Sequence, residues 1–170
     1  QTLADRIIEK AFDTSWYFGF DGTNSMALSL IFNGGEIAET STNTISANEW
    51  NHVAFTYDKD AGGTDEAKIY INGVQKGTGN YDTAIGTDNK NVTIADYHAG
   101  GGYGFDGKID EVAIWNRSLS TDEIWDIYQR GLNLKFQARN CSSADCSDGT
   151  FSGYYNTSPI NLNSLSDTRY

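Results

Sequence analysis

Apolar and polar residues alternate with a period of two along much of the chain, which is typical of β-strands with one face buried. In the segment 14–32, Trp16, Phe18 and Phe20 share one face. A turn at 21–24 follows, and the same alternation then resumes. These two runs predict a β-hairpin.

Further strands are expected from the same pattern. The clearest lies at 50–58, where Val53, Phe55 and Tyr57 fall on one face. The pair Asn72-Gly73 indicates a hairpin turn between two more strands. Shorter or weaker strands are expected at 36–40, 68–72, 74–77 and 91–95. Many short strands joined by Gly and Asn turns indicate an all-β, antiparallel sandwich.

The segment 108–116 does not separate its apolar and polar residues by parity, which predicts a strand covered on both faces. One short helix is expected near residues 120–130, because Ser120 and Glu123 have the spacing of a capping box. Gly131 suits the end of that helix. A helix of this length is not stable alone in water, so we expect it to pack on a sheet.

The C-terminal segment 132–170 has a different character. It contains an expected strand at 133–140 and an aromatic stretch at 149–156, and it resembles the start of a second β unit, or a tail. Cys141 and Cys146 lie in a short polar loop between them. A disulfide between them is expected, which favours an oxidising compartment, with two free thiols as the alternative.

Net charge excludes some partners. The formal charge is −11 and the sequence pI is about 4.4, so the surface repels phosphate backbones and nucleic acid is not an expected ligand. No apolar run reaches the ~20 residues that span a bilayer, so membrane insertion is not expected. The acidity suits divalent cations, or simply solubility.

Three segments resemble one family in their order and spacing. They are WNHVAFTYD at 50–58, KIYINGVQKGTG at 68–79 and FDGKIDEVAIWNRSLSTDEIWDIY at 105–128. Together they resemble the laminin G-like jelly roll of the concanavalin A-like lectin and glucanase superfamily. The resemblance implies a domain over 1–131 made of two antiparallel sheets packed face to face. The expected core residues are Trp16, Phe18, Phe20, Phe55 and Ile114.

The chain departs from the family at its start. Such domains usually begin with further strands before the segment that matches Arg6-Ile7-Ile8-Glu9-Lys10. Without them, Phe18, Phe55 and Ile114 are expected to be exposed, which a monomer rarely tolerates. We therefore expect strand exchange, in which another chain or a segment outside these 170 residues supplies the pairing, with folding back of the 133–170 tail as the alternative.

Catalysis is not expected. The resemblance implies a Glu-x-Asp-x-x-Glu strand in the glycoside-cleaving relatives, and the sequence contains no such stretch. Asp110 and Glu111 are adjacent, so on a strand they point to opposite faces and cannot flank one sugar bond.

Two candidate sites remain. Asp96, Tyr97, His98 and Tyr103 lie in a Gly-rich loop, where aromatic rings can stack on sugars. The alternative is a loop whose tyrosines cover the sandwich edge. At Asp110, the resemblance to the glucanases implies a Ca²⁺ ligand, since Ca²⁺ prefers carboxylate and carbonyl oxygens. The alternative there is a carboxylate bonded to backbone N–H groups.

The expected function is a non-catalytic binding or adhesion module, extracellular or at the cell surface, that recognises a glycan or an extracellular protein. The alternative is a calcium-stabilised structural spacer or assembly subunit without a ligand of its own. A glycoside-active enzyme domain is a distant third.

Overall fold

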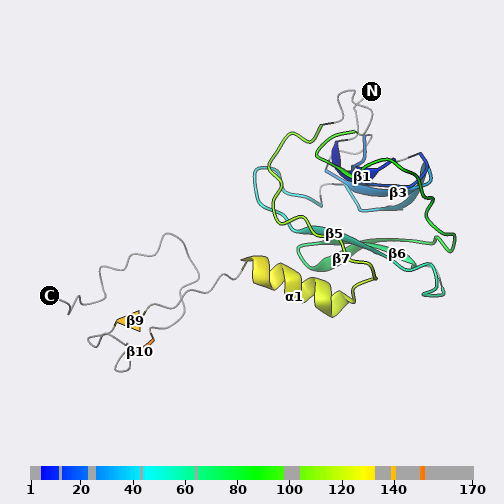
Figure 1. The fold of residues 1–170 in the computed structure, drawn as a ribbon. Coiled ribbons are helices and arrows are strands. Elements are labelled where there is room, and N and C mark those ends of the chain that lie inside the picture. The colour runs from blue at the N-terminus through cyan, green and yellow to red at the C-terminus, as the bar shows by residue number, and fades with distance from the viewer. Residues whose placement is uncertain are drawn as a thin grey trace. The chain divides into compact units, whose positions relative to one another are not determined.

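Two antiparallel sheets form the first part of the chain (Figure 1). The computed structural model describes residues 5–11, 13–22, 26–42, 44–63, 65–97, 104–132, 139–140 and 150–151. The five-stranded sheet has the order β4-β3-β2-β1-β8, with β1 at Arg6–Lys10, β2 at Trp16–Phe20, β3 at Leu28–Phe32, β4 at Gly35–Glu39 and β8 at Thr93–Ile94. The three-stranded sheet has the order β5-β6-β7, with β5 at Val53–Tyr57, β6 at Ala67–Ile71 and β7 at Val74–Gly79.

The core lies between these two sheets, as the alternation predicts. Phe18, Leu30 and Phe32 point inward from the five-stranded sheet and join Ile69 and Ile71 of the other sheet in one buried cluster. The expected all-β antiparallel sandwich with one short helix is confirmed. Each of the predicted strands before residue 95 has its counterpart among β2 to β8.

Helix α1 spans Thr121–Leu132 and begins at the predicted capping box. The Glu123 N–H donates to Ser120 Oγ at 3.2 Å, and the Ser120 N–H donates to Glu123 Oε2 at 2.9 Å. Arg117 adds two hydrogen bonds to the Glu123 carboxylate, which lower its pKa to about 2. Gly131 does not end the helix, because the helix continues to Leu132.

Ile124 holds the helix against the outer face of the three-stranded sheet. It is buried together with Leu119 and Tyr70, a residue of β6 that points away from the main core. The expectation that the helix packs on a sheet is therefore confirmed.

The predicted strand at 108–116 does not form. Residue Gly104 is bridged to Arg6 in the five-stranded sheet, whereas Leu119 packs on Tyr70 outside the other sheet. The chain between them crosses from one sheet to the other, so it lies in neither ladder, and Figure 1 shows it as a loop. Ile114 is exposed, so its assignment to the core is wrong.

The remaining core assignments are correct to different degrees. Phe18 is buried, while Trp16, Phe20 and Phe55 are partly buried and pack against the core. The expected exposure of Phe18 is wrong, because its ring packs on Phe55 at a centroid distance of 5.2 Å. On the β1 side of the five-stranded sheet, the two-residue strand β8 pairs with Ile8 and Glu9. The expected strand exchange stays a prediction.

The chain divides into two compact units, Gln1–Tyr128 and Gln129–Tyr170. In the second unit, β9 (Arg139–Asn140) pairs antiparallel with β10 (Thr150–Phe151). Strand β9 falls within the expected strand at 133–140, and β10 falls within the aromatic stretch at 149–156. The predicted boundary after residue 131 stays a prediction. The described part of the chain contains no helix with the length and hydrophobicity needed to cross a bilayer.

Cys141 and Cys146 lie outside the described residues, so their disulfide stays a prediction. Closing so short a loop is expected to contribute no more than ~3 kcal/mol to stability. Mass spectrometry of the native protein after alkylation is expected to show no modified thiol, and two modified thiols after reduction. Two alkylated cysteines without reduction would contradict the disulfide.

Candidate functional site

The outward face of the five-stranded sheet carries four charged residues of β1 and β4, and a β-bulge in each strand places them there. In β1 the register with β2 shifts between Arg6 and Ile8, so that Arg6 lies opposite Gly19 and Glu9 lies opposite Tyr17. Residues three apart on a regular strand face opposite sides, but one inserted residue restores the same side. Both charged residues therefore point away from the core.

The same arrangement recurs in β4. Its register with β3 shifts so that Glu39 lies opposite Ser29 and Glu36 lies opposite Ile31, with Ile37 as the inserted residue. In both strands the sequence reads charged, apolar, apolar, charged: Arg6-Ile7-Ile8-Glu9 and Glu36-Ile37-Ala38-Glu39. This repeated pattern is the sequence signal that strict alternation misses.

Arg6 and Glu9 form a buried ion pair on β1. Their side chains are almost fully inaccessible, and the Arg6 Nη1 donates to Glu9 Oε2. The Arg6 guanidinium lies between two aromatic rings, 4.7 Å from the centroid of Tyr17 and 4.4 Å from that of Tyr97. Cation–π contacts of this kind strengthen when water is excluded. Tyr97 thus closes over a charge that the strand alone would leave exposed.

Tyr17 belongs to the same buried group. Its hydroxyl donates to the Phe20 carbonyl at 2.6 Å, and burial raises the pKa of the phenol well above its usual value. It therefore stays neutral and acts as a fixed hydrogen-bond donor beneath Arg6.

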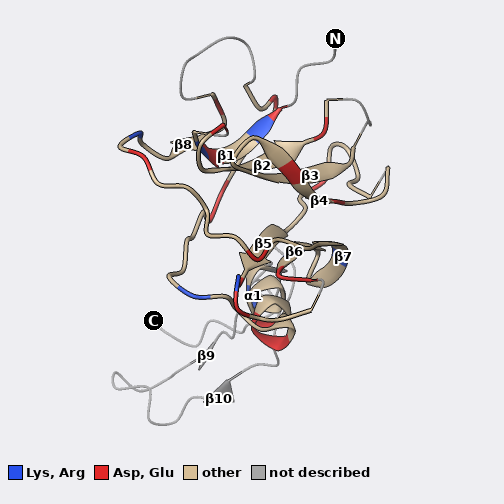
Figure 2. Cartoon of the chain, turned by 90° about the vertical axis from the view of Figure 1, so that its right-hand side faces the viewer, with Lys and Arg blue, Asp and Glu red and all other residues tan. Residues whose placement is uncertain are grey.

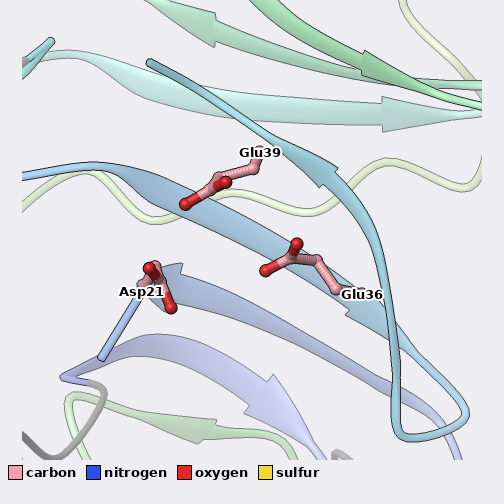
Figure 3. Close-up of side chains that lie close together, drawn as sticks. All are labelled: Asp21, Glu36 and Glu39. Atoms are coloured by element: carbon pink, nitrogen blue, oxygen red, sulfur yellow. The ribbon is translucent and has the colours of Figure 1, made fainter. Parts of the chain in front are cut away.

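Three carboxylates meet further along this face (Figure 3). Asp21 follows β2, while Glu36 and Glu39 come from β4, and an oxygen of each lies within 4.8 Å of an oxygen of the other two. Ser29 Oγ, on the strand between them, donates to Glu36 Oε2 at 3.0 Å. Glu36 is exposed and the other two are half-buried. Such a group can accept hydrogen bonds from hydroxyls or bind a cation.

The structure describes only part of the predicted ligand-binding loop, namely Asp96 and Tyr97. The Tyr97 N–H donates to Asp96 Oδ1 at 2.7 Å, and the Tyr97 ring is half-buried against Arg6. His98 and Tyr103 lie outside the described residues. The alternative was a loop whose tyrosines cover the edge of the sandwich. Tyr97 fits this alternative in part, because one face of its ring covers Arg6.

Asp110 lies apart from the three carboxylates. It is exposed, and its Oδ1 accepts a hydrogen bond from the Glu111 N–H at 2.8 Å, as the alternative reading expects. Among the described residues, the group of three acidic ligands is formed by Asp21, Glu36 and Glu39 and does not include Asp110. The sequence analysis did not identify this group, because Asp21 is far from the two glutamates in the sequence. In addition, only the bulge in β4 brings Glu36 and Glu39 to the same face of the sheet.

The match to a family model agrees with the fold. A family model described as the concanavalin A-like lectin/glucanases superfamily matches residues 2–125. A crystal structure of an S-layer domain-containing protein (residues 221–444) from Clostridium thermocellum ATCC 27405 is 20% identical in sequence, with a TM-score of 0.35. The match covers 75% of this chain and 64% of that one, less than two thirds of its length. No curated protein matches the chain significantly.

Proposed function

The chain belongs to the concanavalin A-like lectin/glucanase superfamily, and on this premise we propose that it is a non-catalytic, extracellular binding module for glycans. We place the ligand on the outward face of the five-stranded sheet, between Tyr97 and the carboxylates of Asp21, Glu36 and Glu39. The observation that carries the proposal is the group of three carboxylates on this face, Asp21, Glu36 and Glu39, two of which the β4 bulge keeps on the same side of the sheet.

The chemistry of this face suits a hydroxyl-rich ligand. Carboxylate oxygens accept hydrogen bonds from sugar hydroxyls, and an aromatic ring packs against the apolar face of a pyranose. Figure 2 shows acidic and basic segments both on strands of this sheet and elsewhere on the chain. Because the net charge is −11, we expect neutral glycans to bind and sulfated or phosphorylated ones to be repelled.

A glycan array probed with the full chain tests the proposal. We expect binding to neutral oligosaccharides, and at least about a tenfold loss of affinity in Glu36→Ala, which removes an exposed hydrogen-bond acceptor at the site. Glu49→Ala is the matched control, since Glu49 is an exposed acid near β5, outside this face, and its loss should leave binding unchanged.

Other outcomes point to other functions. No bound glycan, combined with capture of an extracellular protein that Glu36→Ala abolishes, would replace the glycan by a protein ligand at the same face. Release of reducing sugar from a bound oligosaccharide, lost in the same variant, would replace binding by catalysis. If Glu36→Ala binds glycans as well as the wild type does, the face is not the binding site.

A second candidate function is a calcium-stabilised structural spacer, and it is favoured by one observation. Three carboxylates whose oxygens approach within 4.8 Å repel one another unless a cation or hydrogen bonds compensate. The resemblance to the glucanases instead implies a calcium ligand at Asp110, and that assignment stays a proposal. Separate substitutions of Asp110 and Glu39 distinguish the two candidate calcium sites.

Calcium is expected to raise the melting temperature, because an ion that binds only the native state stabilises it by mass action. At a free calcium concentration one hundred times the dissociation constant, the gain is about 2.7 kcal/mol. The measurement is a thermal melt of the full chain with calcium and with excess chelator. Loss of the shift in Asp110→Asn supports Asp110, whereas loss only in Glu39→Gln moves the ion to the three carboxylates. Identical melts with calcium and with chelator would contradict calcium binding.

A further inference from the structure

A cavity of about 320 Å³ lies on the outer face of the three-stranded sheet, beside the N-terminus of helix α1. Its floor is formed by outward-facing residues of two paired strands, Thr56 of β5 and Lys68 and Tyr70 of β6. One wall is the loop between these strands, and the other is the segment 118–121, which leads into the helix. A volume of this order is at the lower end of the range for small-molecule sites, so the cavity has room for one small ligand.

The floor of the cavity contains a hydroxyl group that the protein leaves unsatisfied. Thr56 is only 6% exposed, and the described residues form no hydrogen bond with its side chain. It lies directly opposite Lys68 in the ladder of β5 and β6, so both side chains are on the face of the sheet that borders the cavity. Most buried hydroxyl groups have a partner, so a buried threonine without one indicates a group that enters the cavity from outside the chain.

The other polar groups of the lining include both donors and acceptors. Of the described charged residues that line the cavity, Asp58, Asp65 and Glu66 are acidic and Lys68 is basic. Lys68 Nζ lies 3.1 Å from Asp65 Oδ2, so its charge is compensated within the lining. Ser118 contributes a further hydroxyl group. The excess of carboxylates disfavours an anion, and the mixture of donors and acceptors suits a ligand that carries hydroxyl groups.

A metal ion fits this lining less well than a neutral ligand. Among the described residues, the three acids whose oxygens approach within 4.8 Å of one another lie on the other sheet. The acids of the cavity do not form such a group, and one of them is paired with Lys68. Ala61 and Leu119 add apolar surface to the lining. Hydroxyl groups, carboxylates and apolar carbon together suit a sugar ring, which presents both hydroxyl and C–H groups.

We propose that this cavity binds a single neutral sugar unit, with the Thr56 hydroxyl as its buried hydrogen-bonding group. The inference rests on the proposed function for its class of ligand, but it concerns a second site, on the opposite sheet of the sandwich. The two sites share no residue, so either can fail without the other. A chain with two sites can engage two sugar units at once, which raises its affinity for a surface that carries many glycans.

A nuclear magnetic resonance titration of the full chain with the methyl glycosides of glucose, galactose and mannose tests the proposal. We expect at least one of them to shift the amide signals of Thr56, Lys68 and 118–121. Thr56→Val should weaken this binding at least about tenfold, because it replaces the hydroxyl by a methyl group of similar size. Thr78→Val is the matched control and should leave binding unchanged. Thr78 pairs with Lys68 from β7 and is exposed, but it does not line the cavity.

Thermal melts establish that the variants fold. If Thr56→Val does not fold, Ser118→Ala takes its place, since Ser118 lies outside the strands and its loss should also weaken binding.

Glu36→Ala separates this site from the proposed glycan face, because it should leave the titration of the cavity unchanged. If Glu36→Ala loses glycan binding while Thr56→Val binds as the wild type does, the cavity is not a site and the face is. The reverse result would overturn the face and support the cavity. Absence of shifts around the cavity with all three glycosides, or equal weakening by Thr56→Val and Thr78→Val, would also overturn the proposal.

Discussion

Replacing Glu9 by leucine is expected to lower the free energy of unfolding by about 3–5 kcal/mol, because the substitution leaves the Arg6 charge buried without its carboxylate. Both side chains are almost inaccessible to water, so hydration cannot compensate for the loss. The two rings around the guanidinium offset only part of the cost. Urea unfolding of the full chain measures the effect.

The double variant Arg6→Met, Glu9→Leu is the control. Replacing a buried ion pair by apolar residues of similar volume is often neutral, so this variant should unfold within about 1 kcal/mol of the wild type. If the double variant is as unstable as Glu9→Leu alone, the cost lies in lost packing of the glutamate side chain and not in the orphaned charge. A stable Glu9→Leu variant would show that Arg6 is not desolvated.

Gly79→Ala is expected to destabilise the sandwich by about 3 kcal/mol, since the new methyl group has no room. A Cβ at Gly79 would lie 1.8 Å from the Ile37 carbonyl oxygen, and a backbone oxygen cannot move aside as a side chain can. Gly77 faces the Glu39 carbonyl in the same way, so β7 and β4 approach each other through their backbones. Thermal or urea unfolding measures the loss.

Gly35→Ala provides the comparison, because a Cβ there would meet nothing closer than 3.7 Å and its φ is not positive. It should change stability by less than about 0.5 kcal/mol. Equal losses in the two variants would contradict the close approach of β4 and β7. They would instead point to a general cost of replacing glycine in these strands.

The sequence predicted those elements in which local pattern and tertiary contact agree. Phe18 and Phe55 lie on the strand faces that a period of two assigns to the core, and they do pack together there. The cap of α1 depends only on residues three positions apart, Ser120 and Glu123, so its hydrogen bonds could be predicted from spacing. Interactions within one short segment can therefore be predicted from the sequence alone.

The wrong predictions concern residues whose positions depend on contacts between segments that are far apart in the sequence. Ile114 has the pattern of a core strand, but its segment must cross between the sheets, and no local signal reports that. The carboxylates of Asp21, Glu36 and Glu39 come together because of register across three strands and one bulge. Sequence spacing alone would have placed Glu36 and Glu39 on opposite faces.

The repeated bulge has a consequence for how such a domain could change over evolution. In each unit, two apolar residues lie between two charged ones. The bulge puts the first and fourth residues on the outward face, and this holds for any side chain at those two positions. At Arg6 and Glu9 the ends have opposite signs and are sealed within the protein, whereas at Glu36 and Glu39 they have the same sign and are reachable from water. Substitutions at the first and fourth positions could therefore convert a buried ion pair into an accessible ligand-binding surface, or the reverse. The two central apolar residues would not need to change.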